Sequence, residues 1–240
     1  MIYIKDCWYI FLILAVVSYF VGCFNFALLI SKLKHKDVRH MGSGNPGTMN
    51  MSRQFGLKVG AATLFLDMFK GGIMVLVGYL IFKDKYFAGT NVLVSDFSRY
   101  LCGVCVIIGH IYPVTMRFKG GKGIASTLGM FWFAITCEYW WMFFIVLAML
   151  LLTLGYIVVS EWGSMGSLFG VSTLTVMQAI IFYFRYQSNL AQPWVIVIFM
   201  LLVLDCFLTW FAHRKNIIAL LSGEEHRTSV KKLSKGKKES

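Results

Sequence analysis

Long apolar stretches separated by short polar segments cover most of the chain. They occupy residues 8–30, 57–82, 98–116, 124–137, 139–159, 164–184 and 193–212. The hydrocarbon core of a bilayer is about 30 Å thick, and a helix needs about 20 mostly apolar residues to cross it. Most of the stretches meet this length, so the pattern predicts an all-α integral membrane protein with about seven transmembrane helices. The least marked boundary is Glu138, and merging the stretches on either side of it would give six helices.

Basic residues next to the stretches predict how the helices are oriented. Most of the 23 lysines and arginines follow the first, third and seventh stretches, which seven helices place on one face of the membrane. Short loops rich in lysine and arginine mark the cytoplasmic side. The N-terminus is therefore expected outside and the C-terminus in the cytoplasm. Six helices would divide the basic loops between both faces, which disfavours that alternative.

Composition supports the same class and bounds the domains. Hydrophobic residues make up 58% of the chain and charged residues 14%, against about 25% charged in an ordinary soluble domain. Residues 1–221 are expected to form one seven-span membrane domain, and residues 222–240 a basic, disordered cytoplasmic tail attracted to anionic membrane lipids. The net charge of +12 does not indicate a nucleic-acid partner, because membrane topology alone explains basic residues beside the spans.

Two glycine loops carry the first candidate chemistry. They read Gly-Ser-Gly-Asn-Pro-Gly at 42–47 and Gly-Gly-Lys-Gly at 120–123. Glycine has no Cβ, so consecutive backbone N–H groups can point at one anion, and Lys122 and Arg39 add positive charge. The second loop lacks the spacing and the Ser or Thr of a nucleotide-binding P-loop. The loops therefore predict a phosphate site at the membrane surface, next to helices that suit a lipid substrate.

Polar residues within or beside the apolar stretches add weaker signals. Asp67 and Lys70 lie three residues apart on one helical face, where they can pair. His110 lies shortly before the second glycine loop, although a lone histidine in this position is more often a packing residue. His213 and Asn216 also lie three apart, at the end of the last stretch. The chain has no metal-binding motif, and its six cysteines fall almost entirely in apolar stretches, so neither a metal nor another cofactor is expected.

The ordered motifs of the chain resemble those of the bacterial acyl-phosphate:glycerol-3-phosphate acyltransferases, the PlsY family. The similar segments follow one another in that family's order and cover nearly the whole chain. They are Gly-Ser-Gly-Asn-Pro-Gly at 42–47 with Asn50, Leu-Asp-Met-Phe-Lys-Gly at 66–71, Gly-His-Ile-Tyr-Pro-Val at 109–114, Phe-Lys-Gly-Gly-Lys-Gly-Ile-Ala at 118–125, and His213 with Asn216 and Ile217.

This resemblance implies an enzyme of the bacterial plasma membrane that opens phospholipid synthesis. It would transfer a fatty acyl group from acyl phosphate to the 1-hydroxyl of glycerol 3-phosphate and release lysophosphatidic acid and phosphate. A functional link to the enzyme that makes acyl phosphate follows. The catalytic residues implied are Ser43, Lys122, His213 and Asn216, and the substrate-binding residues implied are Arg39, Gly42, Gly44, Asn45, Asn50, Gly120, Gly121, Gly123 and Ser164. The chain departs from the family at Thr48-Met49, where Ala-Thr is usual.

Acyl phosphate already carries a good leaving group, so the enzyme must mainly bring two anionic substrates together and accept one proton. We expect the Lys122 loop to bind the donor phosphate, and Arg39, Ser43 and Asn45 with His213 and Asn216 to bind glycerol phosphate. The proton acceptor is either His213 or the substrate's own phosphate. Two other functions stay open at this point: a transporter of organic phosphates, and a catalytically silent relative that binds lipid phosphates.

Overall fold

Helices form nearly all of the regular structure. The computed structural model of the 240-residue chain describes residues 1–225 and 227, and within them no strand is present beyond two isolated β-bridges. The α-helices are α1 Ile4–Cys23, α2 Phe26–Leu33, α3 Thr48–Phe55, α4 Leu57–Phe82, α5 Val94–Ile111, α6 Ile124–Thr136, α7 Met142–Ser160, α8 Gly163–Tyr186, α9 Pro193–Ala212 and α10 Arg214–Leu221. Three short 3-10 turns complete the set: η1 Val38–His40, η2 Val114–Met116 and η3 Gln187–Asn189.

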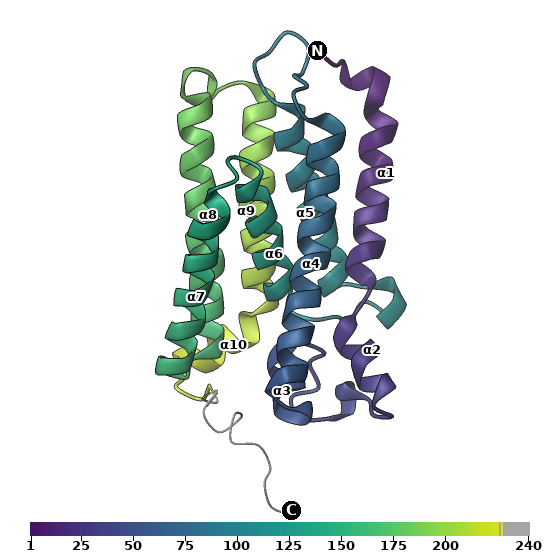
Figure 1. Ribbon diagram of the computed structural model, residues 1–240, viewed down its shortest axis with the longest axis vertical. Coiled ribbons are helices and arrows are strands. Elements are labelled where there is room, and N and C mark those ends of the chain that lie inside the picture. The colour runs from purple at the N-terminus through teal and green to yellow at the C-terminus, as the bar shows by residue number, and fades with distance from the viewer. Residues whose placement is uncertain (226, 228–240) are drawn as a thin grey trace, which may run out of the picture.

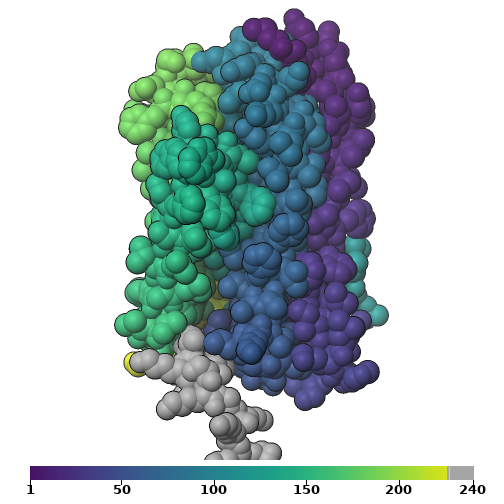
Figure 2. Space-filling view, viewed as in Figure 1, coloured from purple at the N-terminus to yellow at the C-terminus, as the bar shows by residue number. Residues whose placement is uncertain are grey.

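The long helices stand side by side as one bundle (Figure 1). The N-terminus lies at one end, here called the N-terminal end, and α2, α3 and α10 lie at the opposite end, here called the loop end. Contacts join α1 to α5, α4 to α5 and α6, α5 to α9, and α7 to α8. Figure 2 shows α1, α4 and α7 covering one face of the bundle. The expected all-α membrane architecture is confirmed, since six helices among the described residues are long and apolar enough to cross a bilayer.

The fourth expected span, 124–137, forms a helix of nearly the predicted length, but this helix is too short to cross the hydrocarbon core by itself. Its helix α6 has 13 residues, or about 20 Å at 1.5 Å per residue, which is less than the hydrocarbon thickness. It is nevertheless separate from α7, as the break at Glu138 predicted. Because α6 and α7 are two helices, the N-terminus and α10 lie at opposite ends of the bundle (Figure 1).

The first expected span is two helices, because the backbone turns at Phe24 and Asn25 between α1 and α2. Asn25 caps α2 by accepting a hydrogen bond from the N–H of Leu28 at 2.8 Å. At the end of α1, Lys70 Nζ donates to the carbonyls of Gly22 at 3.3 Å and Phe24 at 2.7 Å. Lys70 is also ion-paired with Asp67 at 3.0 Å, which confirms the predicted buried pair. This pair therefore satisfies carbonyls that the break leaves without helical partners.

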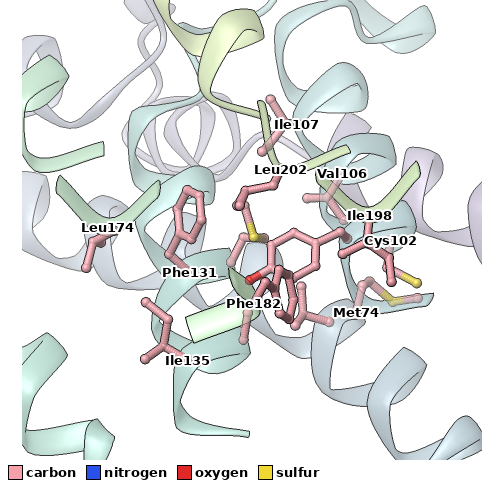
Figure 3. Packing of buried hydrophobic residues seen from close by; sticks show 14 of the residues in the cluster. Met74, Cys102, Val106, Ile107, Phe131, Ile135, Leu174, Phe182, Ile198 and Leu202 are labelled. Atoms are coloured by element: carbon pink, nitrogen blue, oxygen red, sulfur yellow. The ribbon is translucent and has the colours of Figure 1, made fainter. Parts of the chain in front are cut away.

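Apolar side chains fill the space where α4, α5, α6, α8 and α9 meet. Figure 3 shows part of this core, in which Met74, Cys102, Phe131, Phe182 and Leu202 pack together. All six cysteines are free thiols, as expected for packing residues.

Four charged side chains, three of them buried and Arg185 partly exposed, form a network toward the N-terminal end, where α5 begins and α8 ends. Arg99 Nη2 contacts Asp96 and Glu138 at 2.5 Å each, and Arg99 Nη1 donates to the carbonyl of Ala134 at 2.7 Å. Arg185 binds the same two carboxylates from α8. Through Arg99, the network provides a hydrogen-bond donor for a carbonyl in the last turn of the short helix α6, which ends inside the bundle.

Candidate active site

The first glycine loop is held in shape by Asn50 of α3. The side-chain oxygen of Asn50 accepts from the N–H of Ser43 at 3.3 Å, and its amide nitrogen donates to the carbonyls of Val38 at 3.3 Å and Met41 at 2.9 Å. Asn50 is buried. Gly42 and Gly44 adopt φ of 57° and 69°, a left-handed region that favours glycine. Asn50 therefore holds the first glycine loop in shape, and its predicted role in binding substrate stays a prediction.

Arg39 does not join the residues that gather at the second loop. Its guanidinium pairs with Asp37, with Nη2–Oδ2 and Nε–Oδ1 distances of 2.5 and 3.0 Å, and its side chain is 46% exposed. We predicted that Arg39 would bind glycerol phosphate. In this structure the partner of the guanidinium is the neighbouring carboxylate of Asp37, and the binding of glycerol phosphate by Arg39 stays a prediction.

The second glycine loop is bonded to the end of α5. The N–H groups of Gly120 and Gly121 donate to the carbonyls of Ile111 at 3.0 Å and His110 at 3.1 Å. A Cβ at Gly120 would lie 2.1 Å from the His110 carbonyl oxygen, so the close approach requires glycine. These two N–H groups therefore position the loop and are not free to bind an anion, contrary to our expectation.

The amides that remain belong to Lys122, Gly123 and the first turn of α6. Gly123 precedes α6 with φ of 84°, and the first helical bond runs from the N–H of Thr127 to its carbonyl. Helix N-terminal N–H groups point away from the helix and favour anions. The loop thus presents the Lys122 ammonium beside a helix N-terminus.

Lys122 joins the second loop to α10. Its Nζ donates to the side-chain oxygen of Asn216 at 2.5 Å. His213 lies one turn earlier, between α9 and α10, and is 4% exposed. Residues 94 positions apart in the chain therefore meet at the loop end, as the two motifs predicted.

His213 is held in one tautomer. Its Nδ1 lies 2.9 Å from the carbonyl oxygen of Thr209, and because a carbonyl only accepts, Nδ1 carries the proton. The pKa of His213 is lowered to about 4, mainly by burial. The hydrogen bond to Thr209 raises the pKa, and the positive charge of Lys122 lowers it. The imidazole is therefore neutral at physiological pH, and its Nε2 is an acceptor.

The charges around Lys122 include two residues that sequence reasoning did not assign to the site. Burial lowers the pKa of the Lys122 ammonium; the carboxylate of Glu225 raises it, and the charge of Arg53 on α3 lowers it. Arg53 follows Asn50 by three residues, but in the sequence it resembles any basic residue next to a membrane span. Glu225 falls in the segment that we expected to be a disordered tail.

The remaining predicted residues lie at the same end with fewer contacts. Ser43 and Asn45 belong to the first loop, where the N–H of Gly47 donates to the carbonyl of Asn45 at 2.9 Å. Ser164 lies in the first turn of α8, which contacts α10. Within residues 1–225 and 227, no group of three or more His, Cys, Asp or Glu side chains could hold a metal ion.

Known proteins with this sequence pattern are acyltransferases. The family model described as "Glycerol-3-phosphate acyltransferase" matches residues 12–223. The chain is 36% identical to the glycerol-3-phosphate acyltransferase of Finegoldia magna, over 90% of this chain and 95% of that protein. It is 35% identical to that of Aquifex aeolicus, over 90% and 98%.

Solved structures agree. The crystal structure of PlsY (YgiH), an integral membrane glycerol 3-phosphate acyltransferase, in its glycerol 3-phosphate form has a TM-score of 0.68 and 31% identity, covering 90% of this chain and 94% of that one. The lysophosphatidic acid form of the same enzyme has a TM-score of 0.66. With a family match over most of its length and a shared fold, the chain belongs to the glycerol-3-phosphate acyltransferase family.

Proposed function

We propose that this protein transfers a fatty acyl group from acyl phosphate to the 1-hydroxyl of glycerol 3-phosphate, giving lysophosphatidic acid and inorganic phosphate. Membership of the family supports the acyl transfer, and the relative solved with glycerol 3-phosphate and with lysophosphatidic acid supports this acceptor and product. The single observation that carries the proposal is the contact between Lys122 and Asn216, because it joins two separate motifs into one polar site.

The site suits a phosphate. Lys122 and Asn216 supply an ammonium and an amide group, Arg53 adds a second positive charge, and the N-terminus of α6 lies beside them. Charge-assisted hydrogen bonds of this kind are about twice as strong as neutral ones. Since Lys122 and Asn216 are bonded to each other, they bind one phosphate together. We assign them to glycerol 3-phosphate, which replaces our expectation that Lys122 and Asn216 bind different substrates.

The chemistry needs no covalent enzyme intermediate. The 1-hydroxyl oxygen forms a bond to the acyl carbon, the bond from that carbon to the phosphate oxygen breaks, and inorganic phosphate leaves. An efficient general base has a pKa near the working pH, whereas that of His213 is about 4. We therefore propose that a substrate phosphate accepts the hydroxyl proton, while His213 Nε2 accepts a hydrogen bond and orients the acceptor.

The arrangement also fits the expected location. The glycine loops, α10 and most of the predicted cytoplasmic basic residues belong to the loop end. We propose that this end faces the cytoplasm at the bacterial plasma membrane, where glycerol 3-phosphate arrives from water. The acyl donor enters from the bilayer, which makes the enzyme that produces acyl phosphate a functional partner.

The proposal is tested with the full-length chain purified in detergent. Labelled glycerol 3-phosphate is supplied with palmitoyl phosphate or, separately, with palmitoyl-coenzyme A, and lysophosphatidic acid and phosphate are both measured. We expect equal amounts of the two products with palmitoyl phosphate and none of the lipid without the acceptor. Product formed only with the coenzyme A donor would overturn the donor assignment, and no product with either would favour a catalytically silent relative.

A further inference from the structure

The chain folds back over its own candidate phosphate site just after α10. The N–H of Glu224 donates to the carbonyl of Ala219 at 2.8 Å, which reverses the backbone after Gly223. The next residue, Glu225, then reaches Asn216, whose side-chain nitrogen lies 3.5 Å from Glu225 Oε1. Asn216 is the residue whose other side-chain atom binds Lys122. A carboxylate of the chain therefore contacts Asn216, and its charge acts on Lys122.

The second carboxylate oxygen of Glu225 has no good partner. Oε2 is buried and makes no hydrogen bond among the described residues. A buried oxygen without a hydrogen bond weakens the contact, because the group has lost its bonds to water without replacing them. A phosphate offers three acceptor oxygens to the same donors, so a substrate can compete with this carboxylate.

A separate contact anchors the segment at Trp162. The guanidinium of Arg227 lies over the ring of Trp162, 5.6 Å from its centre. Trp162 precedes α8, at the loop end. Residues 223–225 and Arg227, here called the strap, are thus anchored on both sides of Glu225, by α10 and by Trp162.

Apart from its first residue, Gly223, the strap lies outside the residues that the family model matches. The family model matches residues 12–223 and ends where the strap begins. Acyl transfer as such therefore does not require Glu225, and a regulatory contact fits its position better than a catalytic one.

We propose that Glu225 is a built-in competitor: its carboxylate occupies the anion site at Lys122 and Asn216 and must leave before glycerol 3-phosphate binds. This inference rests on the proposed function, since it takes Lys122 and Asn216 to be the glycerol 3-phosphate site. If the strap occupies the site part of the time, only the open fraction of the protein can bind glycerol 3-phosphate. The apparent Kd is then the intrinsic Kd divided by that open fraction.

Three variants of the full-length protein test the strap. Glu225→Gln removes the competing charge, and Arg227→Ala removes the anchor. The matched control is Glu224→Gln, which removes the same charge from the exposed neighbouring residue. With palmitoyl phosphate saturating, we expect the KM for glycerol 3-phosphate to fall roughly 3–10-fold in the first two variants and to change little in the control, with kcat within about twofold throughout.

Arg227→Ala distinguishes release of the strap from the effect of changing a charge near the site. Loss of a positive charge near the site would by itself weaken phosphate binding and raise KM, whereas release of the strap lowers it. A KM that rises or does not change in Arg227→Ala, or a Glu225→Gln variant that matches the control, would overturn the proposal.

Equilibrium binding of labelled glycerol 3-phosphate, measured without an acyl donor, tests the strap independently of the proposed acyltransferase function. A lower Kd in Glu225→Gln and Arg227→Ala supports the strap even if no variant forms product, in which case only the proposed function fails. Product formed by every variant with unchanged KM and Kd overturns the strap and leaves the function intact. Absence of measurable binding in all the proteins would overturn the strap.

Discussion

At the residue scale, His213 has one ring nitrogen bonded to the carbonyl of Thr209, which leaves the other, Nε2, as an acceptor. If it orients the acceptor and does not take its proton, His213→Gln should keep kcat within about tenfold of the original, because a glutamine oxygen can also accept a hydrogen bond. Loss of a general base would lower kcat by about 100–10,000-fold. The turnover number at saturating concentrations of both substrates distinguishes the two roles.

The pH profile gives a second measurement of the same residue. Because the pKa of His213 is lowered to about 4, the imidazole loses its proton as the pH rises past that value and stays neutral above it. The ratio of kcat between the original protein and His213→Gln should therefore be constant from about pH 6 to 8. Substrate phosphate, with a second pKa near 6, produces any inflection that both proteins share. A ratio that changes near pH 6.5 would show that His213 titrates as an ordinary imidazole.

Much of the site could be predicted from the sequence, because its residues belong to motifs that occur in a fixed order along the chain. Lys122 and Asn216 were expected at one face and do meet there. Arg53 and Glu225 were not assigned to the site, since a basic residue beside a span and an acidic residue in a charged tail have common explanations that need no site. Hydrogen bonding inside the loops is also invisible in the sequence, so the use of the Gly120 and Gly121 amides to hold α5 was not anticipated.

At the element scale, the short helix α6 positions the second loop, and glycine allows it to lie directly against α4. A Cβ on Gly129 would lie 1.9 Å from the backbone oxygen of Met68. Gly129→Ala should therefore force the helices apart and lower the free energy of unfolding by about 1–3 kcal/mol. Thermal unfolding in detergent measures this loss.

The matched control for that substitution is Gly155→Ala on α7, where a Cβ meets nothing within 4 Å. Alanine is the better helix former by roughly 0.5–1 kcal/mol in an open position. Gly155→Ala should thus unfold at the same temperature as the original protein or slightly above it. Equal losses in the two variants would mean that the contact of Gly129 with α4 has no special role.

The network of Asp96, Arg99, Glu138 and Arg185 secures the other end of α6. Arg99→Met would leave two buried carboxylates sharing Arg185 and remove the donor to Ala134, so we expect a loss of about 3–5 kcal/mol. Adding Glu138→Gln should restore part of it, because one of the uncompensated charges is then gone. Denaturation of both variants checks this, and a double variant less stable than Arg99→Met would contradict the account.

Apolar length predicted the long helices well and the end of α6 to within one residue, but not the break between α1 and α2 or the contacts that hold these helix ends. The end of α6 depends on Arg99 and Glu138, which are 39 residues apart in the chain, and the break after α1 depends on Lys70 of α4. Such tertiary contacts leave no trace in the local hydrophobic pattern. For this reason 8–30 was expected as one continuous helix, whereas it forms two.

At the scale of the whole molecule, the polar groups lie at two places with different characters. Lys122, His213 and Asn216 gather at the loop end, whereas the charges toward the N-terminal end are paired with one another. A transporter needs a path between the two ends with polar groups at its middle. The separation of an anion site from an ion-paired network suits an enzyme that draws both substrates to one membrane face.

The central claim is that Lys122 binds substrate phosphate in an acyltransferase, and the kinetics of Lys122→Ala test it most directly. The control is Lys119→Ala, which removes the same charge from an exposed position in the same loop. With glycerol 3-phosphate and palmitoyl phosphate, we predict that Lys122→Ala lowers kcat/KM about 100–1,000-fold and that Lys119→Ala stays within about twofold. Equal activity of the two variants would contradict the account.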